Sequence, residues 1–130
     1  MSDRVQLEVE LPRAEVASHV ARHALRALCA EQVETDLLID AELLVSELAT
    51  NALVHGRGNI KLRAAIEADR LWAEVVDEGA GFAHALHARD RDQGGGWGLD
   101  IVDDVASRWS MHEARVWFEI ERQGPRFERA

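Results

Sequence analysis

Hydrophobic and polar residues alternate in four segments of the chain, and this period of two is typical of half-buried β-strands. The segments cover residues 5–11, 60–66, 71–75 and 115–121. Pro12 ends the first strand, and Gly124-Pro125 follows the last. Ala68-Asp69 lies between the second and third segments and predicts a tight turn. Residues 59–77 are therefore expected to form an antiparallel hairpin.

Three further segments carry apolar residues at helical spacing. The first covers residues 14–30, and its apolar positions are Val16, Val20, Ala24 and Leu28. The second covers residues 34–54, with Thr35 or Asp36 as N-cap and Gly56 as the stop. Its expected buried positions are Leu37, Ala41, Leu44, Leu48 and Ala52. The third helix begins near residue 99, with Leu99, Val102, Val105 and Ala106 on one face.

Residues 79–97 keep neither period, because glycine and charged residues dominate there. A loop of this length in a compact domain is usually functional or mobile. The predicted order is β-α-α-β-β-loop-α-β. Strands paired in hairpins, with the helices gathered elsewhere, predict an α+β fold built as a two-layer sandwich. We expect a single domain over residues 1–130, with its core in residues 5–121.

Composition and charge narrow the class of protein. The chain has 130 residues, 47% of them hydrophobic and 30% charged, which is typical of a globular domain. It contains no apolar run of about 18 residues, and the N-terminus has no secretory signal, so we expect a cytoplasmic protein without a membrane span. The net charge of −9 argues against direct binding of nucleic acid. Cys29 is the only cysteine, which excludes an internal disulfide and favours a packing role.

Glu47 and Asn51 place a carboxylate and a carboxamide one turn apart on the second helix. The carbonyl oxygen of Asn51 is a hard donor of the kind that Mg²⁺ uses alongside phosphates. Glu47 is a candidate general base for a hydroxyl nucleophile. Taken alone, the pair could equally satisfy local hydrogen bonds at the edge of a buried stripe.

Two glycine clusters supply further candidates. Asp77 ends a predicted strand, where its carboxylate could accept a hydrogen bond from an exocyclic amine. The nearby Gly79 and Gly81 would let a planar ring approach the backbone closely. Gly94, Gly96 and Gly98 precede a helix, and such loops can cradle phosphates. Taken separately, the first cluster also fits a plain turn, and the second fits a flexible linker.

Together the three segments resemble the nucleotide site of the GHKL ATPase superfamily, the histidine-kinase-like ATPases with the Bergerat fold. Residues 46–56 resemble its N box, residues 77–81 its first glycine box and residues 94–99 its second. The segments 105–109 and 116–119 are most similar to those of small anti-sigma-factor serine/threonine-protein kinases. The resemblance implies a mixed, mostly antiparallel sheet with the helices on one face. It also implies the cofactors ATP and Mg²⁺.

The resemblance assigns a role to each of these residues. Asn51 would ligate Mg²⁺ on the ATP phosphates, and Asp77 would bind the adenine amino group. Glu47 would accept the proton of a serine on a partner protein. The remaining cofactor-binding residues would line the base pocket or close over the phosphates: Gly79, Gly81, Gly94, Gly96, Gly98 and Leu99. Relatives often have a Gly-Lys-Thr turn before the last strand, with a hydroxyl near the base. This chain has Glu113-Ala114-Arg115 there and lacks the threonine.

The resemblance therefore implies a protein serine kinase that controls transcription by partner switching. Its protein partner would be an anti-sigma antagonist, a sigma factor or both. The resemblance is also compatible with a homodimer. The alternative is a nucleotide-gated regulator that holds its partner without phosphorylating it. A third reading is a relic of the fold that binds no nucleotide. His19 and His23 are spaced four residues apart on a helix, but no third ligand completes a metal site, so we expect a surface or packing role.

Overall fold

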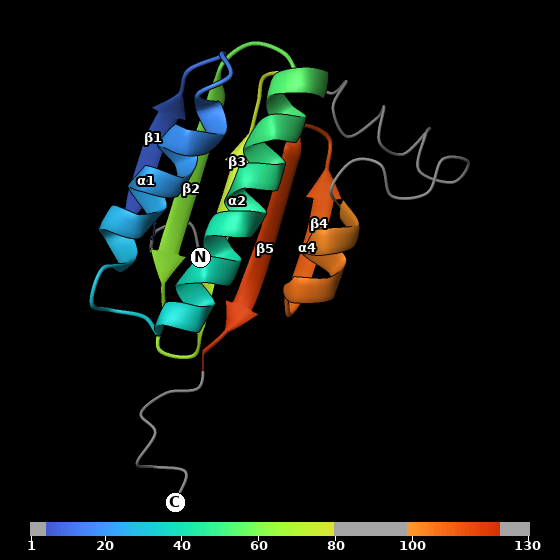
Figure 1. Ribbon diagram of the computed structural model, residues 1–130. Coiled ribbons are helices and arrows are strands. Elements are labelled where there is room, and N and C mark those ends of the chain that lie inside the picture. The colour runs from blue at the N-terminus through green and yellow to red at the C-terminus, as the bar shows by residue number, and fades with distance from the viewer. Residues whose placement is uncertain (1–4, 80–98, 123–130) are drawn as a thin grey trace, which may run out of the picture.

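The computed structural model describes residues 5–79 and 99–122. Figure 1 shows the arrangement of the elements. The described helices are α1 (Ala17–Cys29), α2 (Thr35–His55) and α4 (Leu99–Val105). The described strands are β1 (Leu7–Leu11), β2 (Ile60–Ile66), β3 (Arg70–Val76), β4 (Arg108–His112) and β5 (Arg115–Glu121). The predicted loop after Gly79 lies largely outside the described residues.

The five described strands form one sheet in the order β1-β2-β3-β5-β4, and each neighbouring pair is antiparallel. All three described helices lie on one face of this sheet (Figure 1). The α+β two-layer architecture predicted from the sequence is therefore confirmed. The predicted hairpin is also present, because β2 pairs with β3 in the register Leu62↔Val75.

Helix α2 lies over the centre of the sheet and packs mainly against β3, with further contacts to β2 and β5 (Figure 1). All five of its predicted buried positions are buried. Gly56 ends the helix, and its N–H donates to Ala52 O over 2.9 Å. The N-terminus differs from the prediction, because Glu34 takes the N-cap position without a side-chain hydrogen bond. The predicted caps Thr35 and Asp36 already lie within the first turn.

Helix α1 packs against α2 and β1 through a different row of side chains from the one predicted. The buried residues are Ala17, Ala21, Leu25 and Cys29. Val16, expected in the stripe, is 51% exposed, while Val20, Ala24 and Leu28 are half-buried. The two buried alanines let the helix backbone lie close to its neighbours. Small side chains at the contact thus displace the buried row by one residue.

Strand β4 was missing from the sequence prediction. It forms the edge of the described sheet and pairs with β5 through Trp109↔Phe118 and Met111↔Val116. Trp109 and Met111 are half-buried against the core, whereas the alternating Arg108, Ser110 and His112 are exposed. With only two apolar residues in five, the edge strand leaves a weak signal in the sequence.

Candidate functional site

Asn51 and Glu47 lie on the C-terminal half of α2, as expected. Asn51 is buried, with 6% of its surface exposed, and it has an interaction partner within the structure. Glu47 lies one turn earlier and is half-buried. The helix therefore presents one enclosed carboxamide and, next to it, a carboxylate that solvent or a docked protein can reach.

Asp77 directly follows β3 and is fixed on one side by backbone groups. Its Oδ1 accepts the Gly79 N–H over 2.8 Å and the Arg57 N–H over 3.4 Å. Its own N–H donates to Ala114 O over 3.0 Å. These contacts join the end of β3 to the turn after α2 and to the β4–β5 turn. The carboxylate is consequently held in one orientation. The residue is also buried, with 6% of its surface exposed.

The second carboxylate oxygen of Asp77, Oδ2, is buried and has no hydrogen-bond partner among the described residues. It lies against the backbone of Gly56, where an added Cβ atom would clash with this oxygen. Burial raises the pKa of the Asp77 carboxyl, and the Gly79 and Arg57 amides act in the opposite direction without cancelling the shift. An unsatisfied buried acceptor is costly, so its presence favours a ligand that donates a hydrogen bond.

Gly56 was predicted as a helix stop at the end of the N-box segment, and the structure adds its contact with Asp77. Its φ of −92° is open to any residue, so the need for glycine comes from the space beside Asp77 rather than from the backbone angle. Sequence periodicity could not reveal the contact, because the two residues lie 21 positions apart.

The β4–β5 turn forms another side of the site and carries the departure from the family pattern. Glu113 has φ 55°, in the left-handed region that favours glycine. The position of the missing family glycine is thus still a left-handed turn, occupied by glutamate. Ala114 accepts the Asp77 N–H through its backbone carbonyl, and Arg115 stands at the position of the threonine.

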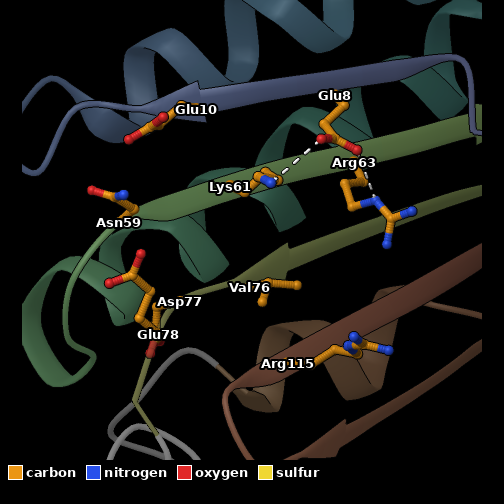
Figure 2. A pocket seen from close by; sticks show the side chains of 9 residues that line it. All are labelled: Glu8, Glu10, Asn59, Lys61, Arg63, Val76, Asp77, Glu78 and Arg115. Carbon is orange, nitrogen blue, oxygen red and sulfur yellow. Dashed lines mark ion pairs between the residues drawn. The ribbon is translucent and has the colours of Figure 1, made fainter.

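Two surface hollows meet at the end of β3. One, of about 470 Å³, lies on the sheet face opposite the helices (Figure 2). The other, of about 350 Å³, lies beside the β4–β5 turn. The residues lining both are Val76, Asp77, Glu78 and Arg115.

The larger hollow contains paired rather than free charges. Glu8 contacts Lys61 at 3.4 Å and Arg63 at 3.3 Å, as Figure 2 shows. Glu74, with 2% of its surface exposed, is bound by Arg63 at 3.2 Å and Arg115 at 3.0 Å. Because each of these cations already has a carboxylate partner, the hollow is a structural ion network and not a ready anion site.

The remaining predicted site residues are placed only in part. Gly79 lies beside Arg57 and donates to Asp77, and Leu99 begins α4, half-buried against the core. Gly81, Gly94, Gly96 and Gly98 lie outside the described residues.

His19 and His23 are both exposed on α1. The rings of His19 and His23 stack with centroids 5.4 Å apart. Within residues 5–79 and 99–122, no group of three or more His, Cys, Asp or Glu side chains is arranged to hold a metal ion. Cys29 is buried, and burial raises its thiol pKa to about 11.

Among the helices that the structure describes, none is long and apolar enough to cross a membrane. A comparison with curated proteins gives no match. A comparison with protein families matches the histidine kinase-like ATPase domain over residues 11–119. This range includes α2, the end of β3 and the β4–β5 turn. The chain therefore belongs to the family of histidine kinase-like ATPase domains, which are ATP-binding domains.

Proposed function

We propose that the protein is an ATP- and Mg²⁺-dependent serine/threonine kinase that binds and phosphorylates a regulatory protein partner. The partner class is an anti-sigma antagonist, a sigma factor or both, as in the anti-sigma-factor kinases that the sequence resembles. The observation that carries the nucleotide part of this proposal is the buried, unpaired Oδ2 of Asp77 beside the bare backbone of Gly56.

The residues around Asp77 fit an adenine ring. An exocyclic amine supplies the hydrogen-bond donor that Oδ2 lacks, while Oδ1 stays bound to the Gly79 and Arg57 amides. Gly56 and Gly79 carry no side chain that would compete for the space next to the carboxylate. A ring bearing a carbonyl in place of the amine would meet acceptor against acceptor, so the site should select adenine.

Asn51 and Glu47 would serve the phosphate end of the site. The Asn51 carboxamide oxygen fits the coordination preference of Mg²⁺, which takes few protein ligands when phosphates are present. Bound ATP would supply the γ-phosphoryl group for transfer. Glu47 would hold the hydroxyl of the incoming serine at a carboxylate oxygen and accept its proton. Its half-buried position at the edge of α2 allows that approach by a second protein.

A nucleotide-gated regulator without transfer would use Asp77 and Asn51 in the same way and would not need Glu47 as a base. One variant therefore separates the two functions. Glu47→Gln keeps the length and shape of the side chain and its ability to form hydrogen bonds. Its carboxamide cannot take up a proton at neutral pH. General-base catalysis contributes about 10²–10⁴-fold, and Glu47 is assigned no contact with ATP, so ATP binding should persist while transfer falls.

The experiment uses the wild-type protein and Glu47→Gln with γ-labelled ATP, Mg²⁺ and the candidate antagonist encoded by a neighbouring gene. We expect label on a serine of that partner, and a loss of roughly 100-fold or more in rate for Glu47→Gln. Calorimetry should give the two proteins similar ATP affinities. Equal transfer by both would remove Glu47 as the base, and ATP binding without transfer by the wild-type would favour the nucleotide-gated regulator.

A further inference from the structure

Arg13 makes an unusual set of contacts just beyond the end of β1. Its Nε donates to Gly58 O over 2.7 Å, its Nη1 to Leu53 O over 2.7 Å and its Nη2 to Ala52 O over 2.8 Å. All three acceptors are backbone carbonyls, 39 to 45 residues away along the chain. One exposed side chain thus ties the start of the domain to the C-terminal end of α2.

Two of these carbonyls belong to the last turn of α2, where helix carbonyls generally lack N–H donors within the helix. Ala52 O also receives the Gly56 N–H, so Arg13 adds a second donor to the group that stops the helix. A cation at this end is favoured by the helix dipole as well. Arg13 therefore acts as a C-terminal cap supplied from another part of the sequence.

The third carbonyl, from Gly58, belongs to the turn of residues 56–58 that forms a wall of the Asp77 site. In that turn, Arg57 donates to Asp77 Oδ1, and Arg57 O accepts the Glu78 N–H over 2.9 Å. Gly56 packs against the other carboxylate oxygen. Arg13 therefore hydrogen-bonds to the backbone before this turn, at Ala52, and at its last residue, Gly58.

We propose that Arg13 is a positioning residue for the nucleotide site, which holds the turn of residues 56–58 in the place that fixes the Asp77 carboxylate. The part of this inference that concerns ATP rests on the proposed function. Arg13 does not line either hollow at the end of β3 and is not assigned a contact with the nucleotide. Its hydrogen bonds hold backbone atoms of the turn. Burial raises the pKa of Asp77, and the charge of Arg13 also acts to lower it. Removal of Arg13 should therefore change ATP affinity and the local order of the turn together.

Arg122 provides a matched control. It also donates to two distant backbone carbonyls over 2.7 Å, those of Glu67 and Gln32. These carbonyls belong to the β2–β3 turn and the α1–α2 connection, at the end of the sheet opposite the Asp77 site (Figure 1). Removing either arginine should therefore weaken the fold, but only Arg13 should affect the site.

The test compares wild-type, Arg13→Ala and Arg122→Ala in two measurements. In calorimetric titration with Mg-ATP, we expect Arg13→Ala to bind roughly 10- to 100-fold more weakly and Arg122→Ala to bind like the wild-type. In hydrogen exchange of the free proteins by NMR, the Glu78 and Gly79 amides should exchange about tenfold faster in Arg13→Ala alone. If the alanine variant does not fold, Arg13→Lys replaces it in both measurements.

The inference would be overturned if both variants bound ATP as tightly as the wild-type, or if both bound it more weakly by the same factor. Loss of Arg13 would then have no effect specific to the site. If the wild-type itself binds no ATP, the proposed function fails. The exchange measurement, which uses no nucleotide, still decides whether Arg13 holds the turn against Asp77. Unchanged exchange at both amides in Arg13→Ala would refute it.

Discussion

Gly56→Ala is the substitution that most directly perturbs the wall of the Asp77 site. The added Cβ would clash with Asp77 Oδ2 and would lie 2.7 Å from both Ala52 O and Asp77 Cγ. The carboxylate must therefore move by at least about 0.7 Å to reach an ordinary contact of roughly 3.4 Å. Asp77 cannot turn away freely, because Oδ1 is held by the Gly79 and Arg57 amides. Overpacking of this kind costs about 1–3 kcal/mol.

The effect of Gly56→Ala on ATP binding follows from the displaced carboxylate. A hydrogen bond to a charged group contributes about 1.5–3 kcal/mol. At 1.4 kcal/mol per tenfold, its loss weakens ATP binding by roughly 10- to 100-fold. Calorimetry measures the affinity, and urea denaturation measures the free energy of unfolding.

Arg122→Ala is the control for this prediction. It removes hydrogen bonds to Glu67 O and Gln32 O at the end of the sheet opposite Asp77 (Figure 1). We expect lower stability with near wild-type ATP affinity. Wild-type affinity in Gly56→Ala, despite its lower stability, would refute the assignment of Asp77 to the base pocket.

Three further predictions concern stability, each measured by urea denaturation. Glu113→Gly should gain about 0.5–1 kcal/mol, because relief of the left-handed φ exceeds the entropy cost of glycine; a loss would contradict this. Glu74→Gln should lose roughly 1–3 kcal/mol, since Arg63 and Arg115 lose a buried partner; no change would mean that the network contributes nothing. For Asp77→Asn, stability relative to wild-type should rise as the pH increases through the raised pKa of Asp77, because the wild-type must ionise a buried group; a constant difference would argue against that shift.

The sequence predicted the elements whose signals are local. The strong 3.6-residue period of α2 gave its buried residues and its stop at Gly56, and the alternation in residues 60–75 gave the β2–β3 hairpin. Asp77 could be placed at a strand end for the same reason. These features depend on neighbours within one turn or one strand, which a single sequence displays directly.

The contacts that build the site join residues far apart in the sequence and left no such signal. Two examples are the packing of Gly56 against Asp77 and the hydrogen bonds from Arg13 to the end of α2. Both depend on how the layers pack. The displaced buried row of α1 has the same origin, because alanine carries a weak hydrophobic signal but permits close packing. Strand β4 escaped prediction because an edge strand needs few apolar residues.

The central claim is that the Asp77 carboxylate recognises the amine of adenine. Calorimetric titration with Mg-ATP and Mg-ITP tests it, because inosine carries a carbonyl where adenine carries the amine. We expect wild-type protein to bind ATP roughly 100-fold more tightly than ITP, and Asp77→Asn, whose carboxamide can donate to a carbonyl, to lose most of that preference. Equal affinity of the wild-type for ATP and ITP, or an unchanged preference in Asp77→Asn, would contradict the claim.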